Sequence, residues 1–400
     1  MIKRILYTLL IMFPVVASAQ INTDRVMAIG RNALYFEDYV LSIQYFNQVI
    51  NAKPYLSDPY FYRGLAKINL DDFQGAESDC SEAIERNPFV VSAYQVRGLA
   101  RIQQNNFAGA IEDYTKALEF APENIGVWHN MALCRIRQED YKGAKNDLDK
   151  LIAISPRYTK AYLMRGEVDL KQKDTLAAEK DFGKAIEIDR YDADTWASRA
   201  ILRLQQQRYK DAEADFDHAI RLSTRNSGVY INRALARYHQ NNLRGAMSDY
   251  DIALDIDPNN FIGHYNRGLL RAQVGDDNRA IQDFNFVIEM EPDNMMAIFN
   301  RGLLLDQTGD YKGAIKDYST VINEYPNFLL GYQYRAQARR KIGDVKGADA
   351  DEFKVLKAQL DKQNGVDPNK QTADNTENNK TRKKSDKNMN NYRKIVVADN

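Results

Sequence analysis

Small, aromatic and polar residues recur along this chain with a constant spacing of 34 positions. Residues 91–124 show the pattern well, in Tyr94, Gly98, Ala110, Tyr114 and Ala117. The spacings of three and four residues predict two amphipathic helices, with a break at residues 104–107 and small side chains where the helices approach closely. One such hairpin leaves an apolar face open to water, so we predict that hairpins stack on both sides of it.

The period can be read from two sets of residues. Seven prolines, which we number position 32 of each unit, are Pro54, Pro88, Pro122, Pro156, Pro258, Pro292 and Pro326. Position 20 holds a small residue in ten successive units, namely Ser42, Ala76, Ala110, Ala144, Ala178, Ala212, Ala246, Ala280, Ala314 and Ala348. The predicted units are 23–56, 57–90, 91–124, 125–158, 159–192, 193–226, 227–260, 261–294, 295–328 and 329–362.

This pattern resembles the tetratricopeptide repeat (TPR) family over residues 23–362. The resemblance implies an all-α fold, an α-solenoid of about ten helix-turn-helix units wound into a right-handed superhelix over residues 20–362. It also implies that the first helices line a concave groove and that the chain binds other proteins.

Two charged columns accompany the repeats. Position 7 is arginine in eight units: Arg63, Arg97, Arg165, Arg199, Arg233, Arg267, Arg301 and Arg335. Position 23 is aspartate in nine: Asp79, Asp113, Asp147, Asp181, Asp215, Asp249, Asp283, Asp317 and Asp351. We interpret them as a structural ladder that sets the register of the two helices, with each exposed pair contributing about 0–1 kcal/mol. Alternatively, the arginines form a track for an acidic partner, although the aspartates would neutralise it locally.

Asparagines at position 6 are the candidate peptide-binding residues: Asn130, Asn232, Asn266 and Asn300. One asparagine side chain can pair with both the N–H and the C=O of a bound peptide, and these resemble the asparagine ladders of some peptide-binding family members. Apolar residues accompany them at positions 2 and 5: Ile231, Tyr265, Phe299, Ile262 and Met296. The alternative is that the asparagines cap helices or bond one another and that the apolar residues are ordinary packing.

The first 19 residues have the features of a bacterial-type signal peptide. Lys3 and Arg4 precede an apolar run at 5–16, and Ala17-Ser18-Ala19 is a small-residue cleavage site before Gln20. About 12 apolar residues are fewer than the roughly 20 that a transmembrane helix needs, and no transmembrane segment is expected after cleavage. We expect an exported protein in the periplasm, with outer-membrane association or secretion as alternatives.

Charge and candidate chemistry exclude several functions. Lysine plus arginine and aspartate plus glutamate both number 55, so the composition does not indicate nucleic-acid binding. His129, His218, His239 and His264 fall at different repeat positions, and no phosphate loop or zinc spacing occurs. We therefore predict no enzyme activity, cofactor or metal. The cysteines are expected to be buried thiols rather than a disulfide.

Residues 363–400 form a polar tail that we predict to be disordered. Its closing stretch, YRKIVVAD, is a candidate docking peptide. Together the patterns predict a non-enzymatic protein- or peptide-binding scaffold or adaptor in an envelope complex. The alternative is a glycan-binding accessory subunit that uses groove aromatics such as Tyr265 and Phe299.

Overall fold

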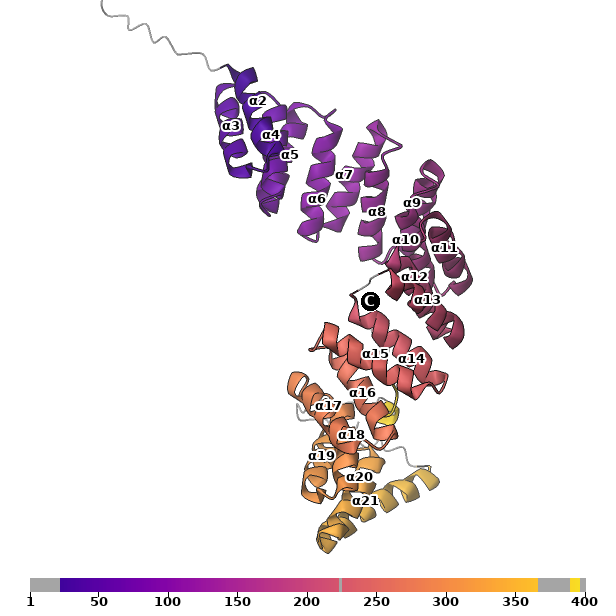
Figure 1. Cartoon of the computed structure of the whole chain (residues 1–400). Helices are drawn as coiled ribbons and strands as arrows, with labels where there is room; N and C mark the ends of the chain where they lie inside the picture. The colour runs from indigo at the N-terminus through magenta and orange to yellow at the C-terminus, as the bar shows by residue number, and fades with distance from the viewer. Residues whose placement is uncertain (1–21, 223–224, 366–388, 396–400) are drawn as a thin grey trace, which may run out of the picture. The chain divides into compact units, whose positions relative to one another are not determined.

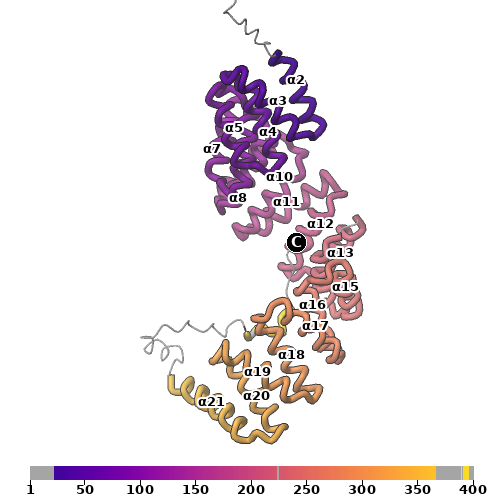
Figure 2. The backbone as a smooth tube through the Cα atoms, turned by 90° about the vertical axis from the view of Figure 1, so that its left-hand side faces the viewer, coloured from indigo at the N-terminus to yellow at the C-terminus, as the bar shows by residue number. Residues whose placement is uncertain are grey.

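The computed structural model describes residues 22–222, 225–365 and 389–395, and within these ranges it contains helices and turns but no strand (Figures 1 and 2). It forms two compact units, each larger than the repeat units: the N-terminal compact unit, residues 1–189, and the C-terminal compact unit, residues 190–400. The boundary falls at Arg190, a position where most units have the closing proline. The predicted all-α fold of consecutive helix-turn-helix pairs is confirmed.

Each compact unit contains five hairpins. The first unit consists of α2 (Thr23–Tyr35), α3 (Tyr39–Ala52), α4 (Asp58–Ile68), α5 (Phe73–Arg86), α6 (Val91–Gln103), α7 (Phe107–Phe120), α8 (Ile125–Arg137), α9 (Tyr141–Ile154), α10 (Thr159–Lys171) and α11 (Thr175–Ile188). The second consists of α12 (Ala193–Gln205), α13 (Tyr209–Arg221), α14 (Ser227–His239), α15 (Leu243–Ile256), α16 (Phe261–Gln273), α17 (Asp277–Met290), α18 (Met295–Thr308), α19 (Tyr311–Glu324), α20 (Leu329–Lys341), α21 (Val345–Gln363) and the 3-10 turn η1 (Met389–Asn391).

The turn inside each hairpin depends on one left-handed residue and one helix cap. The left-handed residue is Glu37, Asp71, Asn105, Glu139, Lys173, Gln207, Asn241, Gly275, Gly309 or Gly343. In the last three units it is glycine, which adopts positive φ without the penalty of a side chain. The next residue is usually Asp or Asn; the carboxylate of Asp140, for example, accepts from the Gly143 N–H at 3.0 Å.

Close helix contact explains the alternation of small and aromatic residues. A Cβ atom added to Gly98 would lie 2.7 Å from the Tyr114 ring, and one added to Gly166 would lie 2.5 Å from the Phe182 ring. Tyr114 and Phe182 are fully buried, and all ten residues of the position-20 column are 0 % exposed. Each glycine therefore lets the ring of the second helix lie directly against the first helix.

The position-7 arginines join neighbouring hairpins as well as the two helices of one hairpin. Arg233 of α14 donates to Asp249 of α15 at 2.6 and 3.0 Å, and to Asp217 of the preceding hairpin at 2.7 Å. The same bond to position 23 occurs in all eight units that have the arginine: Arg63–Asp79, Arg97–Asp113, Arg165–Asp181, Arg199–Asp215, Arg233–Asp249, Arg267–Asp283, Arg301–Asp317 and Arg335–Asp351.

These aspartates are only 1–5 % exposed, so the ladder is not a set of surface ion pairs. Removing one partner of a buried pair leaves an uncompensated charge and costs about 3–5 kcal/mol, well above the 0–1 kcal/mol of an exposed pair. The guanidinium groups are also engaged on both sides, which argues against their serving as a track for an acidic partner.

A second cation, at position 11, contacts the same carboxylate and was missed in the sequence pattern. It is Lys67, Arg101, Arg135, Arg203, Arg237, Arg271 or Arg339. Its 34-residue spacing was readable in the sequence, but unit five has Asp169 and unit nine has Leu305 at this position. Asp169 is instead paired with Lys145 of the preceding hairpin.

The two cysteines, Cys80 on α5 and Cys134 on α8, are buried free thiols. Burial raises the pKa of Cys80 to about 12 and that of Cys134 to about 11. Both thiols therefore remain protonated at neutral pH and behave as small apolar side chains.

Unit four departs from the ladder because Met131 occupies its position 7. Asp147 keeps one bond from Arg135 at 2.7 Å, and its Oδ2 has no hydrogen-bond partner within the described ranges. Burial raises the pKa of Asp147 to about 6, although Arg135 opposes the shift. A carboxyl pKa raised by folding stabilises the protein when protonated, so this contribution is lost as the pH rises from about 4 through 6.

We expect Met131→Arg to complete the ladder in unit four. The new guanidinium would reach Asp147 of the same hairpin. It would also lie near Thr115 of the preceding hairpin, whose hydroxyl is 4.0 Å from the Met131 sulfur. Relative to the uncharged control Met131→Leu, the free energy of unfolding at about pH 8 should rise by about 1 kcal/mol. The difference should shrink as the pH falls through about 6, because Asp147 then becomes protonated in the folded control and no longer carries an unpaired charge. Urea denaturation at several pH values measures this; a difference that is absent or does not depend on pH would contradict the assignment.

Candidate peptide-binding groove

A segment of the C-terminal tail lies against the first helices of three hairpins in the C-terminal compact unit, namely α14, α16 and α18. Residues 389–395 begin with η1 and contact α18, although the sequence predicted a disordered tail there (Figures 1 and 2). Met389 is 1 % and Ile395 8 % exposed, so this part of the tail is packed rather than free in solvent.

The main chain of the segment is held by two side chains. The Tyr392 carbonyl accepts hydrogen bonds from the Tyr265 hydroxyl at 2.7 Å and from Asn300 Nδ2 at 2.5 Å. Asn300 Nδ2 also donates to the Met296 carbonyl at 2.9 Å, which orients the amide. Burial raises the pKa of Tyr265, so its hydroxyl stays a donor at neutral pH. Both bonds recognise a backbone carbonyl, which every amino acid supplies.

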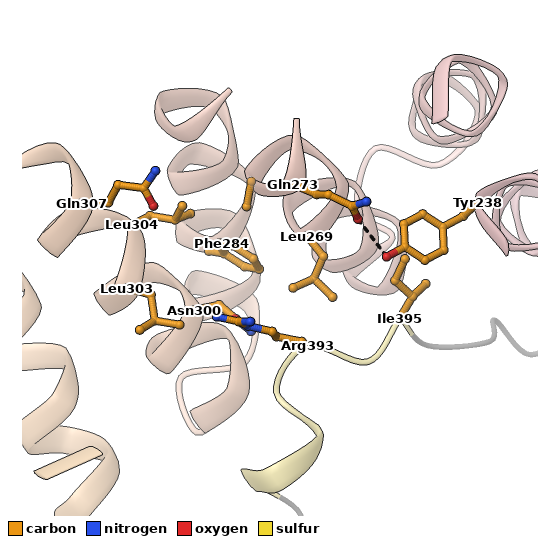
Figure 3. A pocket seen from close by; sticks show the side chains of 11 residues that line it. Tyr238, Leu269, Gln273, Phe284, Asn300, Leu303, Leu304, Gln307, Arg393 and Ile395 are labelled. Atoms are coloured by element: carbon orange, nitrogen blue, oxygen red, sulfur yellow. Dashed lines mark hydrogen bonds between the residues drawn. The ribbon is translucent and has the colours of Figure 1, made fainter. Parts of the chain in front are cut away.

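Apolar contacts hold the segment on either side of this carbonyl. The Tyr392 ring meets the Phe299 ring edge to face, with centroids 4.8 Å apart and an interplanar angle of 86°. Met389 packs in the same apolar cluster as Phe299. Ile395 packs in another cluster with Tyr238 of α14 and Leu269 of α16 (Figure 3).

A cavity of about 360 Å³ remains between the segment and α14, α16 and α18 (Figure 3). It is lined by Tyr238, Leu269, Ala272, Gln273, Phe284, Asn300, Leu303, Leu304, Gln307, Arg393 and Ile395. The Tyr238 hydroxyl donates to Gln273 Oε1 at 2.8 Å across the cavity wall. The groove thus has apolar walls, amide groups at its edge and unfilled volume beside the segment.

The predicted groove residues divide into two groups. Tyr265, Phe299 and Asn300 contact the tail segment. Ile231, Asn232 and Asn266 are 0 % exposed, as Phe299 is with the tail segment in place. Ile231 packs in an apolar cluster with Tyr250 and Leu270.

The remaining candidates lie at the margins. Ile262 and Met296 are partly buried on α16 and α18, and both pack against apolar clusters. Asn130 is partly buried on α8, in the N-terminal compact unit. Asn300 of α18 donates to the Tyr392 carbonyl of the tail, and Asn266 and Asn232 occupy the same repeat position on α16 and α14.

Sequence reasoning named the closing stretch YRKIVVAD as a candidate docking peptide, but it missed Met389, the place where the segment binds and the cavity wall. Met389, Tyr392 and Ile395 are spaced three residues apart in an otherwise polar stretch, and this spacing was a readable indication of docking. Tyr238, Leu269 and Leu303 were missed because their position in the repeat does not show which side chains a tail would cover.

The described residues offer neither a metal site nor a membrane-spanning helix. Within residues 22–222, 225–365 and 389–395, no group of His, Cys, Asp and Glu side chains is placed to hold a metal ion. His264 stacks on Phe286 at 4.0 Å and contacts Asp283 at 3.0 Å, a packing role. None of the described helices is long and apolar enough to cross a membrane.

Family models described as tetratricopeptide repeat match residues 91–124, 125–158, 159–192, 198–261 and 265–327. The chain belongs to the tetratricopeptide repeat family. TPR proteins bind protein or peptide partners, so the chain is a protein-interaction scaffold. The family assignment rests on both units, because the matched residues lie on either side of Arg190.

Solved structures of similar fold include a TPR protein from Parabacteroides merdae, 21 % identical, with 62 % of this chain and 98 % of that one covered and a TM-score of 0.48. MamA from Desulfovibrio magneticus RS-1 is 17 % identical, with coverages of 42 % and 96 % and a TM-score of 0.41. YrrB, titled a TPR protein with an unusual peptide-binding site, is 20 % identical, with coverages of 46 % and 95 % and a TM-score of 0.39. No curated protein matched the chain. These similarities carry no argument about function.

Proposed function

We propose that this TPR protein is a non-enzymatic scaffold whose C-terminal compact unit binds short protein segments along α14, α16 and α18. The observation that carries the proposal is the paired donation from Tyr265 and Asn300 to one backbone carbonyl, next to the Phe299 ring. Main-chain hydrogen bonds supply affinity for polypeptide in general, while apolar contacts on either side select the side chains that fit.

The contacts favour a polypeptide over a glycan. Tyr265 and Asn300 both donate to one backbone carbonyl, and the Phe299 ring packs edge to face on the ring of Tyr392. The groups that hold the segment recognise a peptide carbonyl and apolar side chains. We therefore keep protein binding as the proposed function and find no contact that favours the glycan alternative.

Export to the cell envelope is part of the proposal. Its support is the sequence of residues 1–19, which lie outside the described residues. A scaffold in the periplasm would meet partner segments from envelope proteins. The envelope complex itself is an inference from this location.

Selection from a random peptide library tests segment binding. The target is the full chain with Met389→Ala, Tyr392→Ala and Ile395→Ala, changes that remove the segment's side-chain anchors. We expect micromolar binders, and adding Tyr265→Phe and Asn300→Ala should weaken them by about tenfold or more because two hydrogen bonds are lost. The matched control Asn259→Ala, in a loop outside the groove, should leave binding unchanged. Failure to enrich binders, or equal affinity in both variants, would refute the proposed function.

N-terminal sequencing of the protein expressed in a bacterium with a periplasm tests export. The periplasmic protein should begin at Gln20, because the small residues before it fit signal peptidase. Leu9→Arg with Leu10→Arg interrupts the apolar run, and this variant should stay in the cytoplasm with its leader uncut. Recovery of uncut native protein from the cytoplasm would contradict the predicted location.

A further inference from the structure

We propose that the segment Met389–Ile395 is an internal ligand of the groove and that partners bind by displacing it. This inference rests on the proposed function and specifies the partner's chemistry. The partner is a protein segment with an apolar residue, an aromatic residue three positions later and an aliphatic residue three positions after that.

The spacing follows from which side chains of the segment are buried. Met389 and Ile395 are buried and Tyr392 is partly buried, whereas Asn391 and Lys394 are exposed. The three anchors are therefore spaced three residues apart, and Asn391, Arg393 and Lys394 between them are exposed. A partner can therefore vary at the positions of Asn391 and Lys394 without losing an apolar anchor.

The contacts also give the direction of binding. Met389 and the Tyr392 ring pack in the apolar cluster of α18, whereas Ile395 packs in the cluster that includes α14. The Tyr392 carbonyl lies between them, bonded from α16 and α18. The segment thus runs opposite to the order of the helices, and a partner with the same anchors would bind in this direction.

The segment competes with partners because it is tethered, and it leaves room for them because it fills its site incompletely. Residues 366–388 join it to the end of the repeats, so its binding is intramolecular, with an effective concentration of the order of millimolar. The 360 Å³ cavity beside Arg393 and Ile395 is left for larger partner side chains. If the segment occupies the groove in more than about nine-tenths of the protein molecules, the apparent affinity for a partner falls at least about tenfold.

The test is fluorescence anisotropy with a labelled peptide of residues 387–397, KNMNNYRKIVV. The binding proteins are the full native chain, the full chain with Met389→Ala, Tyr392→Ala and Ile395→Ala, and a matched control with the outward-facing changes Asn391→Ala and Lys394→Ala. We expect the triple variant to bind the peptide at least about tenfold more tightly than the native chain does. The control should bind as the native chain does, and a peptide with Tyr392→Ala should bind the triple variant about tenfold more weakly.

The outcomes separate this inference from the proposed function. Equal affinity in the native chain and the triple variant would overturn internal competition while leaving segment binding intact. If the triple variant binds library peptides but not the 387–397 peptide, the segment is not a ligand and the inference fails alone. If it binds neither, the proposed function fails as well.

Discussion

A buried aspartate on the second helix of nearly every hairpin, held by one or two cations of the first helix, is the constraint on which the rest of the structure depends. Its carboxylate cannot stay ionised at so low an exposure without close partners. In unit seven, Arg233 and Arg237 both bond Asp249 within the hairpin, and Arg233 reaches Asp217 of the hairpin before. The charge therefore sets the rotation of each helix and the phase of the next hairpin, while the close contact of small and aromatic residues sets their separation.

The groove depends directly on this phase. Phe299 and Asn300, which contact the tail segment, immediately precede Arg301, which bonds Asp317 and Asn285. Successive residues on a helix point about 100° apart, so the bonds of Arg301 orient its two neighbours as well. A helix rotated out of phase would withdraw the amide from the Tyr392 carbonyl. Stability and binding thus use adjacent residues of α18.

The local period predicted most of the fold because each unit repeats the same contacts over a few helices. The first helices start at the predicted unit boundaries, with α4 one residue late at Asp58. The docked tail segment could not be derived in this way. The bond from Tyr265 to Tyr392 joins residues 127 positions apart, and no periodic pattern encodes such a contact. The exposure of one repeat position also varies along the array, from the fully buried Asn232 and Asn266 to the partly buried Asn130, and the period does not encode this difference.

Comparing Arg301→Ala with Arg267→Ala by urea denaturation tests the central claim most directly. Among the described residues, Asp317 has Arg301 as its one ion-pair partner, whereas Asp283 keeps Arg271 and His264 after loss of Arg267. Arg301→Ala should therefore lower the free energy of unfolding by about 3 kcal/mol, and Arg267→Ala by about half as much. Equal losses, or a loss below about 1 kcal/mol for Arg301→Ala, would contradict the claim that buried aspartates held by cations of the first helix keep the hairpins in phase.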